Sequence, residues 1–255
     1  MKIKKMKLKN ILLFTVILFF SYFVSAQSST EILQKSEDNL RGKSTIAEMK
    51  MTIQRPKWTR EMEMKVWAKG EDYSLIYLKS PKREAGTTFL KREKEIWNWV
   101  PNIERVVKMP PSMMMQSWMG SDFTNDDLVR SSSILDDYEH ELSGETVINE
   151  MECFEITLIP KPEAPVVWGM VKMWISKEDY IQLKVEFYDE DEFLVNKMEM
   201  SDIIDTDGRK FPAKMVITPE EEPENKTIIE YINIEFDPEI DESIFTVQNM
   251  KRVRQ

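Results

Sequence analysis

Histidine and cysteine each occur once in the chain, as His140 and Cys153, and these side chains are common as a catalytic base and a catalytic nucleophile. A hydrolase of the Ser-His-Asp or Cys-His kind needs a base held against a nucleophile, which commonly sits on a tight, glycine-flanked turn. His140 lies in the charged stretch DDYEHEL without a glycine elbow, and Cys153 alternates with Glu155 and Thr157 as strand residues do. We therefore predict that neither side chain is catalytic and that the protein is not an enzyme.

The carboxylates and glycines do not indicate cofactor chemistry either. Asp122, Asp126 and Asp127 lack the one-three-five spacing of a calcium loop, so we interpret them as turn and cap residues. The chain contains neither GxGxxG nor GxxxxGK[ST], the glycine-rich loops that cradle nucleotide phosphates. A single cysteine allows neither an internal disulfide nor a cysteine metal cluster. We expect no metal and no cofactor.

Apolar side chains give a stronger signal, because one run of them breaks the strand pattern of the chain: Met113, Met114, Met115, Trp118 and Met119. Methionine is flexible and polarisable, which suits a surface that repacks around apolar ligands of varied shape. The run lies between Pro110-Pro111 and the turn Gly120-Ser121-Asp122, which are natural limits for a moving segment. We therefore predict a mobile flap that gates an apolar cavity.

Four further side chains are predicted to line the same cavity, because they occur in pairs on single strand faces: Met62, Met64, Trp97 and Trp99. The alternative for the strand methionines is an ordinary core that uses methionine. Thr124 and Asp127 are spaced like a capping box with Asp in place of Glu, so we expect a short helix from Asn125. The predicted turn and cap residues of this segment are Gly120, Ser121, Asp122, Thr124 and Asp127.

The N-terminus has the pattern of a secretory signal peptide. Five lysines precede an apolar stretch, residues 11–24, that is too short to span a bilayer comfortably. Small residues precede Gln27, so we predict cleavage near Ala26-Gln27 and a single exported domain of residues 27–255. The alternative is an uncleaved membrane anchor. Without those five lysines, 30 basic residues remain against 45 acidic ones, which gives about −15. We therefore expect no binding to nucleic acid.

The elements that must position these side chains are mostly strands. A helix is expected between Ser29 or Thr30 and Gly42, and after it the apolar residues recur with period two. Turn residues divide the alternating runs at residues 47–53, 61–68, 73–79, 87–91, 95–100, 106–109, 153–159, 168–176, 181–187, 194–204, 211–218 and 228–236. The pattern predicts a mainly β (α+β) fold. We expect a single curved antiparallel sheet, an incomplete barrel of about 11 strands. The N-terminal helix and the short helical flap would cover its concave apolar face.

Three segments carry a family resemblance: WNWVP at residues 97–101, Arg105-Val106, and SWMGSDFTNDDL at residues 117–128. They resemble outer membrane lipoprotein-sorting proteins of the LolA-like superfamily. Later segments at residues 153–161 and 184–188, and Asp207-Gly208, also suit that family, so the resemblance covers essentially all of residues 27–255. It implies an incompletely closed antiparallel sheet whose concave apolar face is covered by helices.

The resemblance also implies a function and partners. It suggests a periplasmic carrier that shields lipid or lipoprotein acyl chains during transfer toward the outer membrane, and we expect the protein to be a monomer. The implied partners are an inner-membrane exporter of the RND/MMPL type and an outer-membrane acceptor. The alternative is an exported β-sheet interaction or sensor module that has a filled core and transports no cargo. An open apolar cavity on the concave side would distinguish the carrier from that module.

Overall fold

The computed structural model describes residues 27–93, 95–114, 116–125, 127, 134–162, 164, 166–206 and 208–253. The predicted signal peptide, Lys94, Met115 and Asp126 lie outside these described residues. The first element is the helix α2 (Ser29–Arg41). Its N-cap is Ser28, whose hydroxyl accepts from the Glu31 amide, so the helix begins just before the residues expected to cap it. Within the described residues, no helix is both long and apolar enough to cross a membrane.

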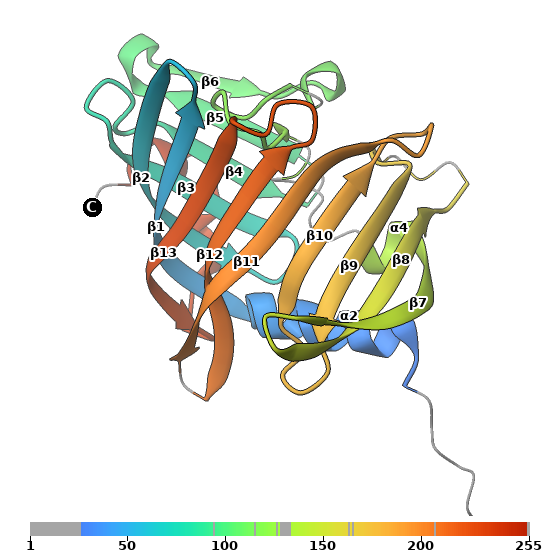
Figure 1. Cartoon of the computed structure of the whole chain (residues 1–255). Coiled ribbons are helices and arrows are strands. Elements are labelled where there is room, and N and C mark those ends of the chain that lie inside the picture. The colour runs from blue at the N-terminus through green and yellow to red at the C-terminus, as the bar shows by residue number, and fades with distance from the viewer. Residues whose placement is uncertain are drawn as a thin grey trace, which may run out of the picture.

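The described part of the chain forms one antiparallel sheet of 13 strands, drawn in Figure 1. The strands of the N-terminal half are β1 (Ser44–Arg55), β2 (Trp58–Lys69), β3 (Tyr73–Ser80), β4 (Thr88–Arg92), β5 (Glu95–Val100) and β6 (Arg105–Lys108). Those of the C-terminal half are β7 (Tyr138–Ile148), β8 (Met151–Pro160), β9 (Met170–Ser176), β10 (Gln182–Tyr188), β11 (Leu194–Thr206), β12 (Arg209–Pro219) and β13 (Lys226–Phe236).

A short helix and four single-turn 3-10 helices complete the described elements. They are α4 (Ile134–Asp137), η1 (Pro101–Ile103), η2 (Pro111–Met113), η3 (Glu242–Ile244) and η4 (Asn249–Lys251). Asn125 and Asp127 have helical backbone, as expected, but their neighbours Asp126 and residues 128–133 lie outside the described residues.

The expected count of about 11 strands is wrong, because the sheet has 13. No apolar pattern predicted β7, which forms one edge of the sheet and leaves most of its side chains exposed. An edge strand that is solvated on both faces has no apolar face to alternate with a polar one. The expected helix, the antiparallel pairing and the open form of the sheet are confirmed for the described residues.

The order of the strands explains how the sheet encloses a space. The spatial order runs from β6 through β1, then β13, to β7, so the first and last strands pair in the middle. β6 and β7 are consecutive in the chain but occupy opposite edges of the sheet. Residues 109–137, which we call the β6–β7 connection, must therefore cross from one edge of the curved sheet to the other.

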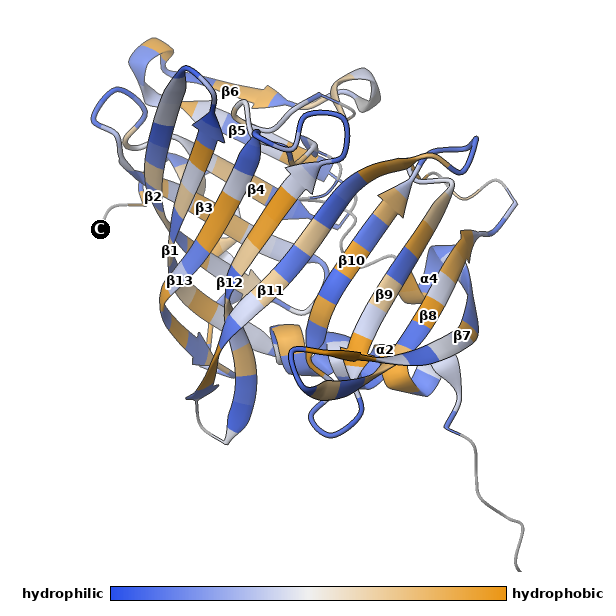
Figure 2. Cartoon of the chain, viewed as in Figure 1, coloured by the Kyte–Doolittle hydropathy of each residue, from blue (hydrophilic) through white to orange (hydrophobic). Residues whose placement is uncertain are grey.

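Strand alternation places one apolar face on the concave side. Figure 2 shows hydrophobic and hydrophilic bands alternating along strands such as β8, β9 and β11. In the centre of the sheet Met51 faces Met62 on one side and Ile229 on the other. α2 packs its buried Ile32 and Leu33 against residues of β8 to β11. Figure 1 shows this helix crossing the sheet near the ends of those strands.

The segment that follows β13, residues 237–253, covers the opposite face of β2 to β4, and we call it the C-terminal segment. Phe245 and Met250 are buried there against Trp67, Leu75 and Leu90. Successive residues of a strand point to opposite faces of the sheet. Phe89 of β4 therefore lies on the concave face, while its neighbour Leu90 lies on the opposite face with the C-terminal segment. The sheet thus carries two separate apolar layers in its N-terminal half.

Candidate functional site

An apolar cavity of about 260 Å³ lies between the concave face of the sheet, α2 and two loops. The sheet contributes side chains from β9 to β13, among them Val171, Met173, Val185, Phe187, Met198, Met215, Ile217 and Ile229. Glu37, Leu40 and Arg41 of α2 form one wall. The loops add Trp118 and Phe123 from the β6–β7 connection, and Val166 and Trp168 from the β8–β9 loop. Three of the lining residues are methionines, whose flexible side chains can repack around a ligand.

The β6–β7 connection reaches the centre of the sheet because its two ends lie at opposite edges. Its middle folds into a compact loop that is closed by an isolated bridge between Ser117 and Thr124. The Trp118 amide donates to the Phe123 carbonyl at 2.7 Å, and the Ser121 hydroxyl donates to the Trp118 carbonyl at 2.7 Å. These bonds hold the loop in a defined shape over the sheet.

Thr124 and Asp127, which are spaced like a capping box, form reciprocal hydrogen bonds in this loop. The Thr124 amide donates to Asp127 Oδ2 at 2.7 Å, and the Asp127 amide donates to Thr124 Oγ1 at 3.1 Å. Each residue therefore satisfies a backbone amide of the other, as in a capping box. Asp127 is also one of the residues that line the cavity. Burial raises the pKa of Asp127, while hydrogen bonds from Thr124 and from the Trp168 indole favour its charged form.

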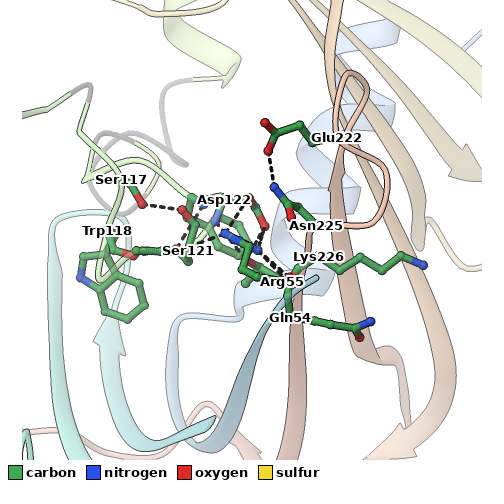
Figure 3. Close-up of polar contacts among 12 residues, drawn as sticks. Gln54, Arg55, Ser117, Trp118, Ser121, Asp122, Glu222, Asn225 and Lys226 are labelled. Atoms are coloured by element: carbon green, nitrogen blue, oxygen red, sulfur yellow. Dashed lines mark hydrogen bonds and ion pairs between the residues drawn. The ribbon is translucent and has the colours of Figure 1, made fainter. Parts of the chain in front are cut away.

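An ion pair fastens the loop to the middle of the sheet (Figure 3). Arg55, at the end of β1, donates to both carboxylate oxygens of Asp122, at 2.9 Å and 3.1 Å. It also donates to the Gly120 carbonyl at 3.2 Å. Thr227 of β13 donates to Asp122 Oδ2 at 2.6 Å and accepts from the Asp122 amide at 3.0 Å. Bidentate pairing of this kind fixes geometry as well as adding energy.

The sequence indicated Asp122 as a turn residue and missed its two partners. Arg55 stands before Pro56, where a single sequence shows only the end of a strand. Thr227 lies 105 positions from Asp122, and no local pattern links the two residues. Only the pairing of β1 with β13 brings them together beneath the loop.

The structure distributes the predicted ligand-binding residues over several places. Met62 and Met64 are buried with Trp118 in a cluster on β1 to β4, and Met119 packs against that cluster. Met113 and Met114 pack on Ile96 and Met109, at the β6 edge. Met115 lies outside the described residues.

The two predicted tryptophans of β5 lie on the other face of the sheet. Trp97 faces Leu90 across the β4–β5 ladder, and Trp99 is two residues further along the same strand. Both pack with the C-terminal segment around Phe245. The structure therefore does not bring Trp97 and Trp99 together with Met62 and Met64. Of the described predicted binding residues, only Trp118 lines the cavity.

Sequence reasoning did not predict most of the cavity wall. Strand alternation marks Val171, Met173, Val185 and Met198 as apolar and inward-facing, but it does not show which half of the sheet stays unfilled. On the concave side of β1 to β4, the buried cluster that contains Met51, Met62 and Trp118 fills the space. On the concave side of β9 to β12, the cavity under α2 remains open. Arg41 of α2 forms an ion pair with the buried Glu37, with Nε 2.8 Å from Oε2.

Both ring nitrogens of His140 lie within hydrogen-bonding distance of neighbouring elements. Its Nε2 is 2.9 Å from the Ile134 carbonyl, which can only accept, and its Nδ1 is 3.1 Å from the Thr30 hydroxyl. In the neutral ring Nε2 then donates and Nδ1 accepts. The imidazole thus links β7 to α4 and to the start of α2. In the described part of the chain, no three His, Cys, Asp or Glu side chains are grouped so that they could hold a metal ion.

Cys153 is expected to be inert toward thiol reagents in the folded protein. Its side chain is fully buried on the outer face of β8 with Trp174 and Ile181, and burial raises the pKa of the thiol. Because the thiolate is the reactive form, a chromogenic disulfide reagent at about pH 8 should label the native protein far more slowly than the urea-unfolded protein. Equal labelling rates for the native and unfolded chains would contradict this burial.

The chain matches one family model, and its fold is similar to that of several solved structures. The model of a family described as "Uncharacterized protein"-like matches residues 70–252. No curated protein matches the chain. A DUF1329 family protein from Desulfovibrio piger is 22% identical with a TM-score of 0.80, over 87% of this chain and 97% of that chain.

Two further solved structures are similar over most of their length. A putative outer membrane lipoprotein-sorting protein domain from Vibrio parahaemolyticus is 22% identical with a TM-score of 0.79, over 88% of this chain and 98% of that chain. A LolA superfamily protein from Nitrosomonas europaea is 17% identical with a TM-score of 0.74, over 88% and 99% of the two chains. At these identities the likeness establishes a shared fold.

Proposed function

Because this chain belongs to the uncharacterized family whose model matches residues 70–252, and is LolA-like in its fold, we propose that it is a periplasmic carrier of lipid or lipoprotein acyl chains. The observation that carries the proposal is the apolar cavity under α2. Each methylene that moves from water into such a cavity gains about 0.8 kcal/mol. A carrier needs that gain to keep an acyl chain in solution between membranes.

The form of the cavity supports a deformable binding site. Its volume of about 260 Å³ is near the lower end of ligand pockets, which span about 300–1,000 Å³. A long acyl chain therefore requires the walls to move. Met173, Met198 and Met215 can change rotamer with little loss of packing. In this proposal Trp118 is the residue of the predicted flap that borders the cavity. Met62 and Met64 pack with it on the concave face, and Met113 and Met114 lie at the β6 edge.

The donor and acceptor follow from the same proposal. A carrier between two membranes receives cargo from one membrane component and delivers it to another, and its direction would come from these partners. An inner-membrane exporter of the RND/MMPL type as donor and an outer-membrane acceptor fit that requirement. The predicted signal peptide at residues 1–26 would take the protein to the periplasm.

The competing interaction module has support from the other half of the sheet. There Met51, Ile53, Met62 and Leu78 are fully buried under Trp118 and fill the concave side. If side chains also filled the concave side of β9 to β13, the protein would have a filled core and no room for cargo. Saturable binding of an acyl ligand separates the two functions.

The test is a titration of the purified protein with a fluorescent fatty acid, using Val185→Phe as the blocking variant. Val185 lines the cavity between Met173 and Met198, so a phenyl ring there occupies the space of the ligand. We expect saturable binding to the wild-type protein. Val185→Phe should weaken it at least about tenfold, which equals about 1.4 kcal/mol.

A control on the same strand isolates the cavity from general overpacking. Leu183 is buried on the outer face of β10 with Trp174 and Ile181. Leu183→Phe adds apolar volume to the same strand without entering the cavity, so the affinity per folded molecule should stay at the wild-type value. If the folded, monodisperse wild-type protein binds no probe saturably, the interaction module is the better account.

A further inference from the structure

A second cleft lies on the face of the sheet opposite to the cavity. It has a volume of about 630 Å³ and lies between β3, β5, η1 and the C-terminal segment, and its walls include Tyr77, Trp99, Pro101, Glu104, Lys251 and Val253. Tyr77 and Trp99 both pair with Thr88 of β4, so their rings flank it on one face. The Thr88 hydroxyl donates to the Met250 carbonyl at 2.9 Å, which fixes the C-terminal segment there. The WNWVP segment thus contributes Trp99 and Pro101 to this cleft.

The chain around this cleft is basic, although the protein as a whole is acidic. Residues 80–86, 101–108 and 249–253 contain two carboxylates, Glu84 and Glu104, and Glu84 is already paired with Arg60 of β2. The same segments carry six exposed basic side chains, which we call the basic patch: Lys82, Arg83, Arg105, Lys108, Lys251 and Arg252. Lys108 pairs with Glu95, whereas the other five form no ion pair with a described residue.

Contacts between these segments bring the cations together. Asn102 Nδ2 donates to the Arg83 carbonyl at 3.1 Å, which ties η1 to the loop between β3 and β4. Lys251 Nζ lies 5.7 Å from the centroid of the Trp99 ring, and Arg105 begins β6 directly after η1 and its cap. Figure 1 shows the C-terminus and β6 on the side of the molecule opposite to β7. The basic patch therefore surrounds η1, at the β6 edge of the sheet.

An apolar side chain lies in the middle of the basic patch. Ile103 of η1 is 59% exposed, and Tyr77 and Trp99 of the adjoining cleft are half-buried. Tyrosine and tryptophan favour surfaces where one end of the ring is apolar and the other is wet. Basic side chains around an apolar one are typical of protein surfaces that lie on a membrane. The cations alone would also suit an acidic protein, but the exposed Ile103 beside two interfacial rings favours lipid.

We propose that the basic patch docks the protein on a membrane surface that contains anionic phospholipid. The cations face the lipid phosphates, and Ile103 enters the interface. The acidic loop between β12 and β13 does not oppose this docking, because four strands separate β13 from β5, on the order of 20 Å along the sheet. That distance exceeds the Debye length, which is about 10 Å at about 0.1 M salt. The proposal goes beyond the carrier function and does not depend on what the cavity binds.

The test is sedimentation of the protein, purified without residues 1–26, with two kinds of vesicle. One kind is phosphatidylcholine with about one third phosphatidylglycerol, and the other is phosphatidylcholine alone. We expect binding only to the anionic vesicles at about 0.1 M salt, and its loss at about 1 M salt, where the Debye length is about 3 Å. Lys82→Gln/Lys251→Gln should weaken this binding about thirtyfold. That factor equals about 2 kcal/mol, the contribution of two cations at an anionic surface.

Matched substitutions separate the basic patch from total charge and from general hydrophobicity. Lys43→Gln/Lys214→Gln removes the same charge from two lysines that form no ion pair with a described residue, one before β1 and one on β12. This variant should bind vesicles as the wild-type protein does. Ile103→Ser should weaken binding about threefold to tenfold, the scale of burying part of one aliphatic side chain. Phe193→Ser alters a side chain that is 70% exposed in the β10–β11 turn and should change nothing.

Several outcomes would overturn membrane docking. Binding to neither kind of vesicle or equally to both does so, as do equal effects of the two lysine pairs. Loss of vesicle binding in Val185→Phe also does so, because that variant blocks the cavity and not the patch. If the wild-type protein ignores both vesicles but binds poly-glutamate, and Lys82→Gln/Lys251→Gln does not, the patch docks an acidic protein instead.

The carrier function is decided by a different measurement. A protein that docks on anionic vesicles but binds no acyl probe retains this inference and loses the carrier function. A protein that binds the probe saturably but does not distinguish the two vesicles retains the carrier function and loses this inference.

Discussion

Asp122→Ala is expected to lower the free energy of unfolding by about 3–5 kcal/mol, the cost of breaking a buried ion pair from one side. The substitution leaves the Arg55 guanidinium, whose side chain is 14% exposed, without its carboxylate partner. It also removes the acceptor of the Thr227 hydroxyl. Of the contacts described between the loop and the strands β1 and β13, only two bonds to the loop backbone would remain, from Arg55 to the Gly120 carbonyl and from the amide of residue 122 to Thr227. Urea unfolding followed by tryptophan fluorescence measures the change.

Two controls give this prediction its specificity. The pair of Lys50 and Glu61 is closer, at 2.7 Å, but it is solvated, so Glu61→Ala should cost no more than about 1 kcal/mol. The double variant Arg55→Ala/Asp122→Ala should be less destabilised than the sum of the two single variants, because it leaves no uncompensated charge. Additive effects, or a cost for Asp122→Ala as small as that of Glu61→Ala, would show that the loop is held by other contacts.

Trp118→Ala is expected to cost a similar amount, about 3–5 kcal/mol, because it removes a large buried side chain. The indole fills the space between Phe89 and the methionines of β1 and β2. Chemical denaturation measures the loss, and Met114→Ala is the matched substitution. Met114 is only partly buried against Ile96 and Met109, so its truncation should cost much less.

The same pair of variants tests the idea of a mobile flap. If residues 113–119 moved as one unit, the two substitutions would change stability little and to the same degree. The structure instead separates them: Trp118 belongs to the core of the sheet, whereas Met113 and Met114 lie at its β6 edge. A small loss in Trp118→Ala, with a large loss of acyl-probe affinity, would favour the gating flap over this packing.

Local chemistry determined the elements of this fold. Alternation along β1, β2 and β11 specifies strands because side chains of a strand point to opposite faces, and one face of a curled sheet must be apolar. The termini of α2 follow from a serine cap and from Gly42, whose φ of +63° favours glycine. The reciprocal bonds of Thr124 and Asp127 follow from their spacing. The edge strand β7 was missed because exposure removes the alternation.

The tertiary structure alone decided where the site lies. Trp97 and Met64 have the same apolar pattern, yet the β4–β5 and β2–β3 ladders put them on opposite faces. Met62 fills the core while Met198 lines a cavity, because α2 and the β6–β7 connection cover the two halves of the sheet differently. Arg55 meets Asp122 only because the first and last strands pair. Periodicity reports which face a side chain takes within its strand, but enclosed volume and long-range ion pairs depend on how distant segments pack in space.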